Sequence, residues 1–309
     1  MSRYAAAFRD IFLIYIFCLL LTFWAGIGKI GESADADADF LDFDGPLPFP
    51  NTFTPERPAK PEGVEVVSET FIDRVFDWED YAKQQRKTVF HIPQSALNSE
   101  IKKFGRPRAM TNPLFLEQRG FKIIERRSFL HGGEIQERVI TIVDYKRIFE
   151  RNLQYFSPLT ESLTVSAEIP VGMDPVPALL SFVQAIPYKK PPHYYNNKFI
   201  GSFFVPLVLL YEQYADCDSK SLLLAEFLGT TPDSKEKMGM VLVRGKGLSH
   251  AVLGVKRKHL LLGKTYLYFA EKGYFIVMET TRQGWSPGFL DPRVLDVIKA
   301  GYFQFIELN

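Results

Sequence analysis

The sequence has few cysteines and no surplus of charge of one sign, and both deficits exclude classes of protein. Two cysteines, Cys18 and Cys217, occur among 309 residues, too few for a small disulfide-stapled scaffold. Lysine and arginine number 37 against 36 aspartate and glutamate residues. Non-specific nucleic-acid binding needs a basic surplus that neutralises phosphates, so we expect no nucleic-acid partner. With 46% hydrophobic and 24% charged residues, the composition is that of a globular protein.

The sequence also lacks the usual motifs for bound cofactors and metals. No phosphate-binding loop, dinucleotide fingerprint or haem-attachment motif occurs. Zinc sites in proteins usually draw on closely spaced pairs of cysteine and histidine. The candidate ligands Cys217, Asp218, His250 and Glu279 do not form such pairs. We therefore expect neither a cofactor nor a metal.

An apolar run near the start of the chain predicts a membrane segment. No charged residue occurs over 11–27, a length at the short end of the roughly 17–25 residues that cross a bilayer as a helix. Arg3 and Arg9 precede this run, and acidic residues follow it. The positive-inside rule then predicts a cytoplasmic segment over 1–10, an anchor over 11–27 and an ectodomain outside the cytoplasm. In a Gram-negative bacterium that compartment is the periplasm.

A removed signal peptide is the alternative to an anchor, because Ala34-Asp35-Ala36 resembles a small-x-small cleavage site. Both interpretations export the rest of the chain. Residues 28–63 combine acidic alternation with a run of prolines between Pro46 and Pro61. Proline at this density gives an extended, semi-rigid spacer. We therefore predict a linker over 28–63 that separates the membrane from the folded body.

Over residues 64–163 the sequence predicts a mixed α/β region in which no catalytic group is evident. Hydrophobic periodicity and turn residues predict, in order, a strand over 88–92, a helix over 95–104, strands over 120–128 and 137–143, and a helix over 144–155. His91 and His131 are isolated in this region. A lone histidine is more often a surface or packing residue than a catalyst.

Residues 164–309 predict an α+β domain. Helical spacing begins at Pro175 and ends at Pro187, and a second helix is expected over 219–228 with Gly229 as its C-cap. Four or five strand-like runs follow, over 240–244, 250–256, 265–270, 274–280 and 302–308. Short spacings with glycine turns indicate an antiparallel sheet. We expect this sheet to pack against the helix that follows Cys217.

Cys217 is the residue that most needs an explanation. It is the only cysteine outside the apolar run, so in an oxidising compartment it has no disulfide partner within the chain. One interpretation is a small buried hydrophobe. The other is a nucleophile, because Asp216 or Asp218 would cap a helix there, and a helix N-terminus lowers the pKa of a cysteine. We favour the nucleophile.

Two later residues could complete a catalytic group with Cys217. His250 begins a predicted strand, and Glu279 directly follows the apolar run 274–278. Taken alone, His250 is most simply a satisfied strand residue. Neighbouring antiparallel strands could nevertheless bring His250 and Glu279 together. A nucleophile, a base and an acid that orients the base is a general design for covalent catalysis.

These blocks resemble the transglutaminase-like cysteine-enzyme superfamily, above all its bacterial branch. The blocks are YADCDSKSLLLAEFLG around Cys217, SHAVLGV with His250, METTRQGWSPG with Glu279, and FVQAIPY upstream. The resemblance covers roughly residues 175–290. Ala215 and Ser249 stand where the family usually has glycine, and a glutamate stands where aspartate is commoner. The family implies a papain-like α+β core.

The resemblance implies a membrane-anchored enzyme that acts on protein or peptide amides through a thioester. Cys217 would be the nucleophile, His250 the base and Glu279 the orienting acid. Water as the acceptor gives a protease or deamidase, and an amine gives a cross-linker. The backbone N–H of Cys217 would bind the oxyanion, with the side chain of Gln184 as a guess for the second donor. Trp285 either lines a substrate groove or packs in the core.

Two alternatives from other classes stay open. An inactive transglutaminase-like ectodomain could serve as a binding module for an envelope membrane protein, because a fold does not imply an activity. The other is a structural ectodomain whose function is carried out by residues 64–163.

Overall fold

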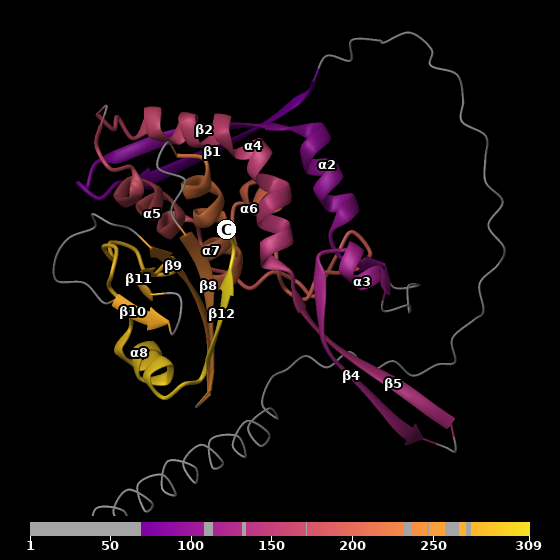
Figure 1. Cartoon of the computed structure of the whole chain (residues 1–309). Helices are drawn as coiled ribbons and strands as arrows, with labels where there is room; N and C mark the ends of the chain where they lie inside the picture. Colours follow the sequence, from indigo (N-terminus) through magenta and orange to yellow (C-terminus); the bar gives the residue numbers. More distant parts are fainter. Residues whose placement is uncertain are drawn as a thin grey trace, which may run out of the picture. The chain divides into compact units, whose positions relative to one another are not determined.

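The computed structural model describes residues 69–107, 114–131, 134–170, 172–231, 237–245, 247–256, 266–269 and 273–309 (Figure 1). All of them belong to one compact unit, Leu41–Asn309. The predicted cytoplasmic segment, anchor and linker over 1–63 lie outside the described residues. Among the residues that the structure describes, no helix combines the length and apolar character needed to cross a membrane.

The second half of the chain forms an antiparallel sheet, as the sequence predicted. Its strands follow the order β10-β11-β9-β8-β12. Their bounds are β8 (Lys237–Gly245), β9 (Leu248–Lys256), β10 (Tyr266–Phe269), β11 (Gly273–Met278) and β12 (Phe303–Glu307). Every neighbouring pair is antiparallel. The α+β class is therefore confirmed, with strand ends that differ from the predicted ones by a few residues.

Alternating side chains divide this sheet into two buried faces. Successive strand residues point to opposite faces. The face toward the helical layer carries Met240, Leu242, Leu253, Ile276 and Met278. The opposite face carries Val241, Val243, Val252, Phe275 and Val277. The second face is covered by α8 (Pro292–Lys299), whose buried Val294, Val297 and Ile298 follow the i, i+3, i+4 spacing of a helix. This short helix was not predicted from the sequence.

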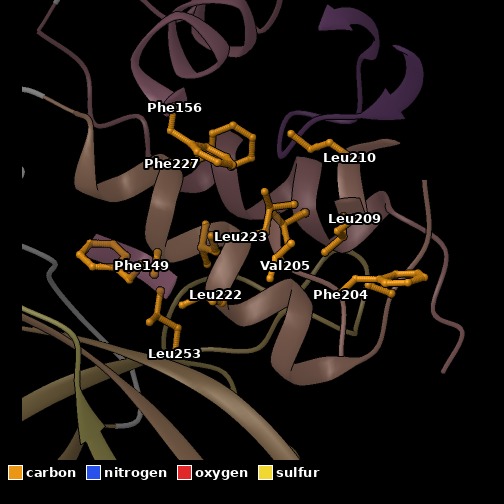
Figure 2. Packing of buried hydrophobic residues seen from close by; sticks show 14 of the residues in the cluster. Phe149, Phe156, Phe204, Val205, Leu209, Leu210, Leu222, Leu223, Phe227 and Leu253 are labelled. Carbon is orange, nitrogen blue, oxygen red and sulfur yellow. The ribbon is translucent and has the colours of Figure 1, made fainter. Parts of the chain in front are cut away.

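Helices cover the first face of the sheet. They include α4 (Tyr145–Ser166), α5 (Val176–Ala185), α6 (Pro206–Glu212) and α7 (Cys217–Gly229). Helix α7 contacts the other three helices and β9, and every residue from Ser219 to Leu228 is buried. Figure 2 shows Phe227 of α7 beside Phe156 of α4, with ring centroids 5.3 Å apart. A helix buried on all sides occupies the centre of a core.

Gly229 allows two helices to pack closely and is not the residue that ends a helix. It was predicted as the C-cap of α7, but the helix includes it and ends at the C-cap Thr230. A Cβ atom on Gly229 would lie 2.7 Å from Leu153 Cδ1 and 3.0 Å from Phe149 Cζ. Both partners belong to α4. Glycine therefore allows α4 and α7 to approach closely.

The first half of the described chain supplies two hairpins and short helices. The elements are β1 (Phe71–Glu79), β2 (Gln85–Pro93), α2 (Gln94–Lys103), β3 (Arg106–Pro107), α3 (Leu114–Gln118), β4 (Phe121–His131) and β5 (Glu134–Val143). The short strand β7 (Lys198–Phe199) pairs with β3, and β6 (Tyr194–Tyr195) pairs with β7. The predicted strands and helices of this region are present, while β1, β3 and α3 were missed and α4 extends eleven residues beyond 155.

Residues on both sides of the predicted boundary after residue 163 share one hydrophobic core. Phe90 of β2 contacts two phenylalanines from the later segment. Its ring centroid lies 5.4 Å from that of Phe182 in α5 and 6.0 Å from that of Phe227 in α7. The β1–β2 hairpin is thereby packed against the helices that carry the candidate site.

Glu226 is a buried carboxyl group within this helical core. It is 0% exposed, and among the described residues neither of its oxygens has a hydrogen-bond partner. The nearby Glu100 is also buried and accepts hydrogen bonds from Arg151 Nε at 2.8 Å and Asn152 Nδ2 at 3.2 Å. Burial, and then the charge of Glu100, raises the pKa of Glu226 well above its usual value.

We expect Glu226→Gln to stabilise the protein most at alkaline pH. The folded-state pKa lies above the unfolded value of about 4.3, so stability is full below that value and is lost as the pH rises through the folded pKa. Glutamine keeps the shape without the charge. Thermal unfolding at pH 8 should show a gain of about 2–4 °C for each kcal/mol recovered. At pH 4.5 the gain should be smaller. The exposed control Glu161→Gln should change neither value, and equal gains for Glu226→Gln at both pH values would contradict the assignment.

Candidate active site

Cys217 is the first residue of α7, and the chain reaches it through a short parallel bridge. Ala215 N donates to Pro187 O at 3.2 Å, and Lys189 N donates to Ala215 O at 3.0 Å. Asp216 is the extended N-cap residue, and its carbonyl accepts from Lys220 N at 3.1 Å. The Cys217 backbone N–H thus lies in the first turn, where helix N–H groups lack intrahelical acceptors. The predicted position of Cys217 at a helix start is confirmed.

His250 and Glu279 meet at the ends of neighbouring strands. Met278 of β11 pairs with Leu253 of β9, which sets Glu279 beside the start of β9. His250 Nε2 and Glu279 Oε2 are 2.8 Å apart. The other carboxylate oxygen of Glu279 accepts from Thr281 N at 2.9 Å and Thr281 Oγ1 at 2.7 Å. The side chains of His250 and Glu279 are only 13% and 2% exposed.

The carboxyl group of Glu279 fixes the tautomer of His250. Burial by itself would raise the pKa of Glu279, but the hydrogen bond and charge of His250 and the hydrogen bonds of Thr281 lower it below the usual value. An ionised carboxylate accepts hydrogen bonds and donates none. In the neutral ring, Nε2 therefore carries the proton and Nδ1 carries the free lone pair, as a general base requires.

The first turn of α7 lies against both of these strand ends. Ser221 Oγ donates to Ala251 O at 3.3 Å and lies 3.2 Å from Thr280 Oγ1. The backbone of Ala251 also stabilises the anionic form of Cys217. Ala251 directly follows His250, and Thr280 directly follows Glu279. The structure thus brings all three predicted catalytic residues to one place.

The electrostatic surroundings of Cys217 differ from what a helix start alone predicts. Burial, followed by the charges of Asp218 and Asp216, raises the pKa of Cys217 above its usual value. Burial and the neighbouring Asp218 also raise the pKa of Asp216 to about 9. Asp218 Oδ2 accepts a hydrogen bond from Tyr145 Oη at 2.8 Å. The resting cysteine is therefore a thiol, and the predicted lowering of its pKa is wrong for this arrangement.

Tyr188 is a residue at the site that the sequence analysis missed. Burial, followed by the charges of Cys217, Asp216 and Asp218, raises its pKa to about 12, and its hydroxyl interacts directly with the thiol. The residue is 59% exposed, so part of its side chain faces solvent while its hydroxyl meets the thiol. Tyr188 ends the block FVQAIPY, and its place in that block was the signal that could have identified it.

Gln184 and Trp285 are joined to the loop that carries Glu279. Gln184 Nε2 donates to Glu279 O and to Trp285 O, both at 2.8 Å, so both amide hydrogens are engaged with carbonyl groups. A cleft of about 580 Å³ lies between the β1–β2 turn, α5 and the loop over 283–287, and its lining includes Asp77, Trp78, Asp80, Ser181 and Trp285. Trp285 is half-buried at the wall of this cleft.

No group of three or more histidine, cysteine, aspartate or glutamate side chains within the described ranges is arranged to hold a metal ion. Comparison with known proteins adds no relative: no protein-family model, curated protein or solved structure matches this chain. The assignment of the site therefore depends on its own geometry.

We expect Gln184→Leu to destabilise the protein by about 1–3 kcal/mol, because two carbonyl groups lose their donor. Urea unfolding followed by tryptophan fluorescence measures the effect. The matched control is Gln154→Leu, since Gln154 is an exposed glutamine that donates to Arg151 O within its own helix. A loss for Gln184→Leu no larger than that of the control would show that the two carbonyl contacts are not needed.

Proposed function

We propose that this protein is a membrane-anchored, cysteine-dependent enzyme that transfers acyl groups from amide bonds of protein or peptide substrates. The observation that carries the proposal is the His250–Glu279 pair beside the first turn of α7. A buried carboxylate holds His250 in one tautomer, and the adjoining backbone contacts the Cys217 thiol. A helix that bears the nucleophile and packs on an antiparallel sheet is also what a papain-like or transglutaminase-like core requires.

In the first half-reaction, the Cys217 proton passes to His250 Nδ1 as the sulfur attacks the amide carbonyl carbon. The carbonyl π electrons move to oxygen and form an oxyanion. When the carbonyl reforms, the C–N bond breaks, and the amine leaves with the proton from Nδ1. The product is a thioester on Cys217. Glu279 stabilises the imidazolium that forms between these steps.

In the second half-reaction, an acceptor attacks the thioester and loses its proton to His250. The C–S bond breaks, and the sulfur regains a proton from the imidazolium. Water as the acceptor completes hydrolysis, and a primary amine completes cross-linking. The Cys217 N–H at the helix start is suited to bind the oxyanion. Tyr188 is better placed than Gln184 to supply the second donor, because the Gln184 amide already serves two carbonyl groups.

One observation favours a second candidate function. Burial and two neighbouring aspartates raise the pKa of Cys217, as expected for a cysteine with no nucleophilic role. Under this alternative the protein is an inactive module that binds a partner in an envelope membrane complex. His250 would then make no difference to how readily the thiolate of Cys217 forms.

Thiol alkylation separates the two candidates. The full chain, in membranes or detergent, is treated with iodoacetamide at pH 7, and labelling of the Cys217 peptide is followed by mass spectrometry. For an enzyme we expect His250→Ala to slow labelling at least tenfold and Glu279→Gln to slow it less, because the imidazole is the proton acceptor. The control His91→Ala removes an exposed histidine paired with Asp73 and should have no effect. Equal rates in the wild-type and His250→Ala proteins would exclude the enzyme.

The acceptor is identified by its products. The wild-type chain and Cys217→Ala are incubated with an unfolded protein such as casein and a fluorescent primary amine. Cysteine-dependent incorporation of the amine indicates cross-linking, release of ammonia indicates deamidation, and new peptide fragments indicate proteolysis. No Cys217-dependent product of any kind would support the binding module.

A further inference from the structure

Lys220 is a fully buried lysine one turn after Cys217. It is 0% exposed. Its ammonium donates to Ile186 O at 2.8 Å and to Gln184 O at 3.3 Å. In the part of the chain that the structure describes, no carboxylate lies within ion-pair distance of this ammonium. Lys220 therefore reaches from α7 to the end of α5, where it is held by backbone carbonyls.

A buried ammonium of this kind is costly unless its charge is used. Removing an ion from water without a partner ion carries a penalty of several kcal/mol. Carbonyl groups at the C-terminal end of α5 offset part of the penalty, because the negative end of the helix dipole lies there. Methionine would fill the same space in this apolar helix without any such cost. Packing alone therefore does not explain a lysine at this position.

The groups around Lys220 are mostly acidic. The charges that act directly on Lys220 are those of Glu279, which follows β11, and Cys217 at the start of the same helix. Further out, Asp216, Asp218 and Tyr188 surround the Cys217 thiol, Tyr145 of α4 interacts with Asp218 and Arg244 of β8, and His250 of β9 pairs with Glu279. Burial lowers the pKa of Lys220 to about 8, and the charges of Glu279 and Cys217 oppose that change. The lysine thus stays largely protonated near neutral pH, close to the ionised carboxylate of Glu279.

We propose that Lys220 is the buried counter-charge of this site, a positioning residue whose ammonium stabilises the anionic sulfur of Cys217 during acyl transfer and orders the backbone over 184–186. The inference rests on the proposed function. In the resting protein, burial and the two aspartates have the larger influence on the thiol, so Lys220 does not create a thiolate by itself. Its field acts when the proton moves from Cys217 to His250, because a nearby opposite charge favours the charged form.

The test is the pH dependence of Cys217 alkylation in the full chain. Lys220→Met keeps the volume and removes both the charge and the hydrogen bonds, whereas Lys220→Gln removes the charge and keeps an N–H donor. We expect both variants to move the midpoint of the pH–rate profile upward by about one unit, the equivalent of about a tenfold slower reaction at pH 7. The control Glu226→Gln replaces a buried carboxyl group about two and a half turns after Cys217 in the same helix and should leave the midpoint unchanged.

Each outcome has a separate meaning. If folded Lys220→Met has the wild-type midpoint, the proposal that Lys220 is the counter-charge is overturned. The proposed enzyme still stands in that case if His250→Ala slows alkylation. A shift in Lys220→Met with a wild-type midpoint in Lys220→Gln also overturns it, since hydrogen bonds rather than charge would then be needed. If neither the lysine variants nor His250→Ala change the rate, the proposed function itself fails. Circular dichroism of each variant shows that the fold is retained.

Discussion

The burial of α7 is the constraint on which the rest of the structure depends. This helix lies between three other helices and the sheet, and its residues from Ser219 to Leu228 are shielded from solvent. Its first turn reaches an edge of the core, and there it meets the ends of β9 and β11. The apolar length of α7 therefore determines where Cys217 stands relative to His250 and Glu279. Close packing transmits this position because a core tolerates few rearrangements.

The same burial creates the chemical conflict within the site. A thiol placed at a helix start would ordinarily be acidified, yet here the surrounding protein and the aspartates on either side favour the neutral form. His250, with its tautomer set by Glu279, supplies a place for the proton. The buried ammonium of Lys220, one turn along α7, supplies positive charge. Under the proposed function, the site transfers a proton during the reaction and holds no thiolate at rest, and a neutral thiol is also less readily oxidised.

Part of the fold was predictable from the sequence because regular elements carry regular patterns. Strands β8, β9, β11 and β12 show alternation that the structure uses on two opposite faces. Short elements such as α8 escaped prediction, since eight residues hold only two turns of a pattern. Gly229 was misjudged for another reason. Glycine can end a helix or allow a close contact, and the decisive neighbours, Phe149 and Leu153, are distant in sequence.

The sequence by itself determined the α+β class, the helix that starts at Cys217 and the three residues that could form a catalytic group. These depend on periodicity, capping and the order of blocks along the chain, all of which are local. Only the tertiary structure decided the direction of the pKa of Cys217, the partners of Gln184 and the presence of Tyr188 and Lys220 around the thiol. Protonation and hydrogen bonding depend on groups that approach through space, and spacing along the chain does not specify such neighbours.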